Sequence, residues 1–253
     1  MIAGARLAGA DRGRRGLSPL IFVHGVGSTA AIWDYQLDGF GRERLCAAVE
    51  LRGNGAGKPD PDPSSIDRAG YADDVLAIAD ALGIERFTLV GCSLGGVVAF
   101  ELWRRAPERI GALLVLGSFA RYPDGARYAE QIVAQVRELN DMRAFGELRA
   151  KKLGLPPARF RETVEQFACK SVDCFVAATQ ATWTGDYSGL LRTIDVPTLV
   201  AYGEHDAVAP RPLAQEIAGG IAGSRMVEIA DAGHVANADN AADFNRLLKE
   251  FVR

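Results

Sequence analysis

A serine flanked by glycines is the clearest candidate for chemistry in this chain. Ser93 lies between Gly91 and Gly95, after the apolar run 87–90 and before a helix-like stretch. A serine on a tight turn between a strand and a helix can act as a nucleophile, and that turn has no room for Cβ atoms on either side. The pattern alone also fits an ordinary glycine-rich turn. The chemical interpretation therefore requires a base, an acid and oxyanion donors elsewhere in the chain.

Three histidines are available to activate the serine hydroxyl: His24, His205 and His234. A serine is a weak nucleophile at neutral pH unless a base with a pKa of about 6.5 removes its proton, which makes histidine the usual partner. His24 opens a glycine turn after a strand-like run, where it is better placed to shape the backbone. His205 adjoins Asp206, and neighbours in sequence seldom point at one another. We therefore predict that His234, which follows the last strand-like run, is the base.

The base needs a carboxylate on its other ring nitrogen, which fixes the tautomer and stabilises the charged ring. Asp206 is the first choice because it follows a strand-like run and gives the chain order Ser, Asp, His expected for this type of turn. Glu204 is the alternative. Asp231 lies near His234 in sequence but is better explained as a cap for local backbone N–H groups. We predict that Ser93, Asp206 and His234 are the catalytic residues.

The negative charge that develops on the attacked carbonyl needs two backbone N–H donors. The first is Leu94, because it directly follows the nucleophile and begins a helix. The second comes from the glycine turn after the first core strand, where we choose the N–H of Val26 and keep that of Gly27 as the alternative. Loss of one such donor typically raises the barrier by about 3 kcal/mol.

We also predict four substrate-binding residues. His24 and Gly25 lie in the same glycine turn, Trp33 follows it, and Trp183 lies much later in the chain. Large aromatic side chains line ligand pockets, although core packing is the competing explanation for each tryptophan. Cys92, next to the nucleophile, is expected to be a small packing residue.

These groups come together if the strands form one parallel sheet. Strand-like runs alternate with helical spacing, which is typical of an α/β protein with a doubly wound, mostly parallel sheet. Reactive side chains then gather beyond the carboxyl ends of the strands. Only helix-like segments occur between about 121 and 188, so we predict a helical cap at 121–188 and a core formed by 1–120 and 189–253. The strand-like runs are 19–23, 44–51, 87–90, 112–117, 197–203 and 225–230.

Composition narrows the possible partners. The chain has 253 residues, of which 48% are hydrophobic and 24% are charged, which suits one large domain with an insertion. A formal charge of -3 gives no basic field for nucleic acid. Charges interrupt each apolar stretch near the amino terminus, and no window is long and apolar enough for a membrane span. We expect a cytoplasmic protein with no nucleic-acid or membrane partner, and oligomeric state is left open.

The cysteines and histidines give no sign of a metal site. The four cysteines form no C-x-x-C pair, and a zinc site would have few histidines to draw on. Free buried thiols are the expected state. We predict that the protein needs no metal and no organic cofactor.

Taken in order, the motifs resemble the α/β-hydrolase superfamily over nearly the whole chain, and within it the 3-oxoadipate enol-lactonase and carboxylesterase-like branch. Five such motifs in the right order are far more specific than any one of them. The resemblance implies an α/β-hydrolase fold with the triad Ser93, Asp206 and His234, and with a helical cap, which we expect after the sixth core strand. The motifs are His24-Gly25-Val26-Gly27, Arg52-Gly53-Asn54-Gly55, Gly91-Cys92-Ser93-Leu94-Gly95-Gly96, Gly203-Glu204-His205-Asp206 and Gly233-His234.

Departures from the family pattern weaken any transfer of the enol-lactonase substrate. Glu50 stands where an aspartate is usual, Asp239 and its neighbours replace a Glu-x-Pro sequence, and the amino-terminal hairpin is short. We predict a serine hydrolase that cleaves a small carboxylic ester or lactone through an acyl-enzyme on Ser93. The alternatives are a C–C bond or thioester hydrolase with the same triad and, in another class, a small-molecule receptor built on the same fold.

Overall fold

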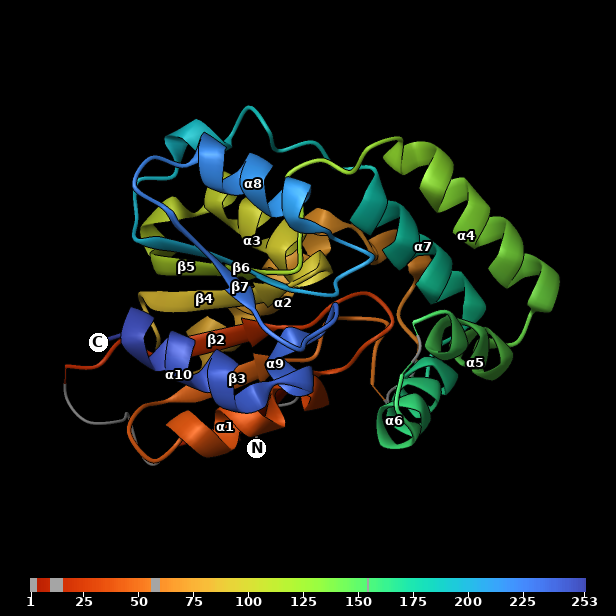
Figure 1. The fold of residues 1–253 in the computed structure, drawn as a ribbon, viewed down its shortest axis with the longest axis horizontal. Coiled ribbons are helices and arrows are strands. Elements are labelled where there is room, and N and C mark those ends of the chain that lie inside the picture. The colour runs from red at the N-terminus through yellow and green to blue at the C-terminus, as the bar shows by residue number, and fades with distance from the viewer. Residues whose placement is uncertain (1–3, 10–15, 56–59, 154) are drawn as a thin grey trace.

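A computed structural model describes the chain except for residues 1–3, 10–15, 56–59 and 154. Its centre is a seven-stranded sheet in the order β1-β3-β2-β4-β5-β6-β7 (Figure 1). β1 pairs antiparallel with β3, and the other neighbouring strands are parallel. The mostly parallel sheet predicted from the sequence is confirmed. The strands are β1 (Ala5–Ala8), β2 (Leu20–Val23), β3 (Cys46–Val49), β4 (Phe87–Cys92), β5 (Ile110–Leu116), β6 (Thr198–Gly203) and β7 (Arg225–Ile229).

The central strands are mostly apolar because helices cover both faces of the sheet. In β2, Leu20 and Phe22 belong to one buried cluster, whereas Ile21 and Val23 belong to the other. Successive side chains of a strand point to opposite faces, so a strand covered on both sides needs an unbroken apolar run.

Two groups of helices supply this cover, on opposite sides of the sheet (Figure 1). In the last helix, Phe244, Leu247 and Leu248 are buried at helical spacing against the sheet. None of the helices in the described residues is both long and apolar enough to cross a lipid bilayer. One group is α2 (Arg68–Ala81), α3 (Leu94–Arg105) and α8 (Arg211–Gly220). The other group is η1 (Ala30–Trp33), α1 (Asp34–Phe40), α9 (Ala236–Asp239) and α10 (Ala241–Phe251). Short helical turns between elements are η2 (Pro63–Ser65), η3 (Pro107–Arg109) and η4 (Leu191–Thr193).

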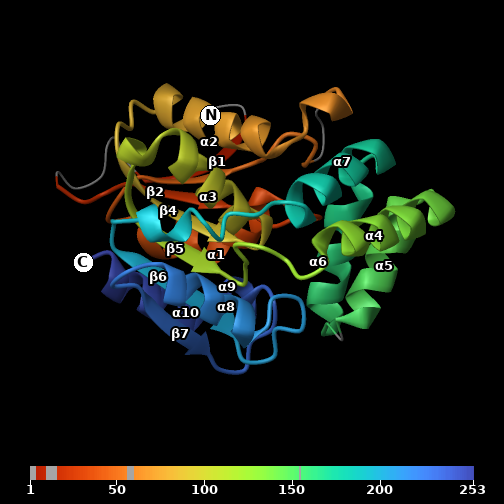
Figure 2. The ribbon, with the colours of Figure 1, turned by 90° about the horizontal axis from the view of Figure 1, so that it is seen from above.

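Four further helices, which we call the cap helices, lie together beside the sheet (Figures 1 and 2). They connect β5 to β6 and therefore follow the fifth strand that the structure describes, so the prediction of an insertion after a sixth strand is wrong. The hairpin usual in the family would place two strands before the parallel strands. The described part of the chain has only β1 there, so the number of strands before the cap is lower by one. The cap helices are α4 (Gly125–Leu139), α5 (Met142–Lys152), α6 (Pro157–Ala168) and α7 (Val172–Trp183).

Candidate active site

Ser93 is the single residue between β4 and α3, and its backbone is in an unusual conformation. Its φ of 55° and ψ of -116° lie outside the regions that side-chain-bearing residues favour. Neighbouring groups hold it there, because its N–H donates to Leu116 O at 2.9 Å and its carbonyl accepts from Ser118 Oγ at 2.7 Å. A strained residue held this firmly at a strand–helix junction is typical of a functional site.

The glycines on either side of Ser93 allow a close backbone approach. A Cβ atom on Gly91 would lie 2.2 Å from Gly95 O, and one on Gly95 would lie 2.2 Å from Val23 O. Both distances are far below van der Waals contact, so neither position accepts a larger residue without a shift of the backbone. This is the steric requirement that the sequence predicts for the turn.

Asp206 and His234 meet beyond the ends of β6 and β7. His234 Nδ1 lies 2.9 Å from Asp206 Oδ2 and 3.0 Å from Oδ1. The carboxylate is buried, and its Oδ1 also accepts the backbone N–H groups of Val208 and Ala209 at 2.9 and 2.8 Å. Burial by itself raises the pKa of Asp206, but the His234 ring and these hydrogen bonds outweigh it and lower the pKa below its ordinary value. Asp206 is therefore a stable anion that orients the ring.

The other ring nitrogen of His234 is available for a reacting group. Within the described part of the chain, Nε2 makes no hydrogen bond, while both contacts of the ring to Asp206 use Nδ1. Ser93 and His234 line the same cavity. Hydrogen bonds between a nucleophile and its base are often long in the absence of substrate and shorten when substrate binds.

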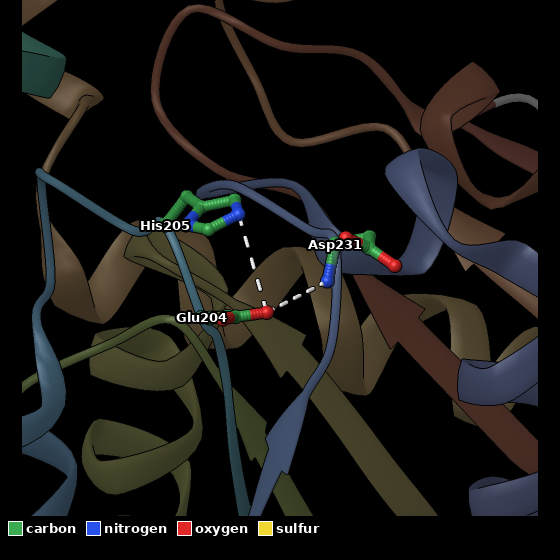
Figure 3. Close-up of side chains that lie close together, drawn as sticks. All are labelled: Glu204, His205 and Asp231. Carbon is green, nitrogen blue, oxygen red and sulfur yellow. Dashed lines mark hydrogen bonds and ion pairs between the residues drawn. The ribbon is translucent and has the colours of Figure 1, made fainter.

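Glu204, the alternative acid, is engaged elsewhere. Its Oε2 accepts the backbone N–H of Asp231 at 3.1 Å and lies 4.0 Å from His205 Nε2. Figure 3 shows these three residues side by side, and all three are exposed. His234 therefore pairs with Asp206, the first choice, and not with Glu204.

The glycine turn after β2 lies directly against Ser93. A Cβ atom on Gly25 would lie 3.1 Å from Ser93 Cβ, and Gly25, Val26 and Gly27 all line the cavity that contains the serine. Leu94 is the first residue of α3, and the first N–H groups of a helix have no acceptor within it. Both predicted oxyanion donors therefore belong to segments that adjoin the serine.

The cavity has a volume of about 190 Å³ and lies between the sheet and the cap helices. The core contributes the serine, the histidine and the glycine turn, while the cap contributes both apolar and charged side chains. Two of the predicted substrate-binding residues, Gly25 and Trp183, are part of its wall, and their contact with substrate stays a prediction. The cap side chains include Arg149, Lys152, Leu153, Leu155, Arg159, Thr163, Gln166, Phe167 and Trp183.

His24 is not part of this wall, contrary to the prediction. It is completely buried, with Nδ1 2.9 Å from Gly25 O, while Nε2 accepts the N–H of Leu51 at 3.3 Å. Glu50 Oε1 lies 3.2 Å from the same Nε2. The ring therefore supports the backbone on either side of it and has no surface left for a substrate.

Trp33 is also absent from the cavity wall, contrary to the prediction. It is completely buried on the face of the sheet that α10 covers, where its ring lies 5.0 Å from that of Phe22 and 6.0 Å from that of Phe244. Its position at the end of η1 turns it toward α10, whereas the preceding residue, Ile32, lines the cavity. The competing explanation, core packing, is correct for this residue.

Three cationic residues of the cap were missed by sequence reasoning. Arg149 and Lys152 of α5 and Arg159 of α6 line the cavity. The three-residue spacing of the first two places them on one face of their helix, which is the only signal that the sequence offers. Basic residues near a helix carboxyl terminus are commonly solvent-exposed partners of the helix dipole, so the spacing alone does not indicate a site.

Comparisons with known proteins identify the family of this chain. Residues 20–247 match the Alpha/beta hydrolase family. The chain belongs to that family. It is similar to 3-oxoadipate enol-lactonase 2 of Acinetobacter baylyi, with 25% identity over 240 residues that cover 92% of this chain and 88% of that one. It is also similar to the pimeloyl-[acyl-carrier protein] methyl ester esterase of Neisseria meningitidis, with 29% identity over 241 residues and 91% of each chain covered.

The fold is shared with solved structures of hydrolases. A crystal structure of a hydrolase from Pseudomonas aeruginosa superposes with a TM-score of 0.85 at 29% identity, and the match covers 98% of this chain and 92% of that one. The predicted fold class and the resemblance to hydrolases of the enol-lactonase and esterase type are confirmed. The protein is therefore a hydrolase of the alpha/beta family.

Proposed function

We propose that this hydrolase cleaves a small carboxylic ester or lactone through an acyl-enzyme on Ser93. The observation that carries the proposal is the pairing of His234 with the buried Asp206, because the His234 ring borders the same cavity as the strained serine. A cavity of about 190 Å³ suits a small substrate. The two similar enzymes named above act on an enol-lactone and on a methyl ester, which supports this bond type.

In the proposed mechanism, Ser93 Oγ attacks the carbonyl carbon while His234 Nε2 takes the hydroxyl proton. Asp206 holds Nδ1–H and stabilises the charged ring. The N–H groups of Leu94 and Val26 bind the oxyanion, with support from the positive end of α3. His234 then gives the proton to the leaving oxygen, and water, activated by the same nitrogen, releases the acid and restores the serine.

The same proposal assigns roles to the two parts of the chain. Residues 1–120 and 189–253 form the catalytic core, and 121–188 form a cap that shapes the substrate cavity. We place the enzyme in the cytoplasm, in agreement with the free state of all four cysteines. Its partner is a small-molecule substrate.

The test is the Ser93→Ala variant assayed on a panel of p-nitrophenyl esters, lactones and vinylogous diketones. We expect the wild-type protein to hydrolyse members of the ester or lactone sets and the variant to lose at least 10³-fold in kcat, because the nucleophile acts as a unit with its base. A fluorophosphonate probe should label the wild-type protein and not the variant.

Ser28 provides the matched control. It lines the same cavity, and its hydroxyl donates to Gln166 Oε1 at 2.8 Å, so Ser28→Ala removes a cavity hydroxyl but keeps the proposed nucleophile. This variant should still be labelled. Full activity of Ser93→Ala would refute the mechanism, preference for the diketones would indicate C–C bond hydrolysis, and labelling without turnover would indicate a receptor.

A further inference from the structure

The cap side of the cavity carries positive charge that the proposed mechanism does not use. Arg149, Lys152 and Arg159 line it, whereas Asp239 is the one carboxylate among its described lining residues. This charge is opposite in sign to the formal charge of -3 on the whole chain. A concave site lined by one sign of charge concentrates ligands of the opposite sign.

Arg159 is already neutralised by neighbouring acids. Its Nη1 lies 2.7 Å from Glu162 Oε2, and its Nε lies 3.5 Å from Asp239 Oδ1. Arg149 is different, because it is half-buried and forms no ion pair with any residue in the described ranges. A half-buried guanidinium has lost part of its hydration, so an anionic ligand would supply the partner that the protein does not.

Arg149 lines the same cavity as Ser93 and His234. Burial raises the pKa of the Tyr122 phenol, and the charge of Arg149 offsets part of that rise. Tyr122 O–H donates to Val208 O at 3.3 Å, and Val208 lines the cavity beside the serine. The N–H of the same Val208 donates to Asp206. Arg149 and Val208 therefore line one cavity with the catalytic serine and histidine.

We propose that Arg149, assisted by Lys152 on the same face of α5, binds a carboxylate of the substrate. The preferred substrates are then small esters or lactones that carry a free carboxyl group. A guanidinium binds a carboxylate through two parallel hydrogen bonds, which fix its direction as well as its distance. This inference rests on the proposed function and adds the specificity-determining residue.

The direct test is binding to the Ser93→Ala protein, measured by isothermal titration calorimetry. The probes are monomethyl glutarate, an anion, and methyl pentanoate, a neutral ester of the same acyl length. We expect tighter binding of the anion, weakened roughly 10- to 100-fold by Arg149→Gln, as for loss of a hydrogen bond to a charged group. Arg149→Lys, which keeps the charge but not the fork, should give an intermediate value.

Arg143 supplies the control on the same helix. It is exposed and paired with Glu165 at 2.7 Å, so Arg143→Gln should leave the binding of both probes unchanged. Equal affinity for the two probes, no binding of monomethyl glutarate, or unchanged binding in Arg149→Gln would each overturn the proposal.

Kinetics on the wild-type serine separate this inference from the proposed function. The substrates are mono-p-nitrophenyl glutarate and p-nitrophenyl pentanoate, with spontaneous hydrolysis subtracted. The carboxylate site predicts that the ratio of the two kcat/KM values favours the glutarate ester and falls in Arg149→Gln, chiefly through KM. Arg149-dependent binding without turnover would refute the proposed function alone, whereas equal turnover of both esters in every variant would refute the carboxylate site alone.

Discussion

Lys170 provides a sharp test of how the cap is attached to the core. Its ammonium group is buried between α6 and α7, where Nζ donates to Gln166 O at 2.7 Å. Burial lowers its pKa from 10.5 to about 8, although the nearby carboxylate of Glu50 opposes the change. The folded protein therefore loses this proton far more readily than the unfolded chain does.

The sign of the effect follows from the two pKa values. Below about pH 8 Lys170 is protonated in both states, so it adds no pH dependence to stability. Between about 8 and 10.5 only the unfolded chain keeps the proton, so the contribution of Lys170 to the free energy of unfolding rises with pH. The full difference amounts to about 3 kcal/mol, from 1.36 kcal/mol for each pH unit.

The assay is urea unfolding of the wild type and Lys170→Met from pH 7 to 10.5, with a reductant present. Buried thiols act in the opposite direction, because burial raises the pKa of Cys46 to about 12 and its contribution to the free energy of unfolding therefore falls above pH 9. Both proteins contain these thiols, so the difference between the two proteins isolates Lys170. Relative to the variant, the wild type should gain about 3 kcal/mol across this range. Exposed Lys151→Met is the control, and a difference that stays constant with pH would refute the reasoning.

Two further predictions concern the site. Asp206→Asn should lower kcat/KM by about 10⁴-fold in initial-rate assays, because its amide nitrogen would face His234 Nδ1 and favour the wrong tautomer; a loss below tenfold would contradict this. Gly27→Ala should lower the free energy of unfolding in urea by about 1–3 kcal/mol, because its φ is 78° and its Cβ would lie 2.3 Å from Phe167 Cζ. Gly223 has a φ of 74° and its Cβ would have nothing within 4 Å, so Gly223→Ala should lower the free energy of unfolding by less. Equal decreases in the two variants would exclude the predicted clash.

The sheet was predictable because its strands are buried on both faces. Runs such as 87–90 and 197–203 are mostly apolar, with one threonine each, and such runs are typical of parallel strands under helices. β1 (Ala5–Ala8) was not predicted as a strand, because its side chains are half-buried or exposed and an edge strand lacks that signal. The error in counting strands before the cap has a different origin, because the sixth strand came from the resemblance to the family, whereas only four strand-like runs precede residue 121.

The meeting of Asp206 with His234 was predictable from topology alone. Both residues follow strands of one parallel sheet, so their side chains reach the same edge whatever the loops do in detail. Trp33 and Arg149 were not predictable in the same way. Helical periodicity gives the face on which a residue lies but not what that face packs against, and the two outcomes, core and cavity, depend on how each helix sits on the sheet.

Several contacts join the cap to the glycine turn after β2. Gly27 is in contact with Phe167 of α6, and Ser28 donates to Gln166 of the same helix at 2.8 Å. Lys170, in the segment that follows α6, is attracted to Glu50. Glu50 in turn accepts the N–H of Ala30 at 3.3 Å, in the segment that follows the glycine turn. We therefore expect a displacement of α6 to move the backbone next to Val26, so that changes in the cap alter the rate of reaction as well as the affinity for substrate.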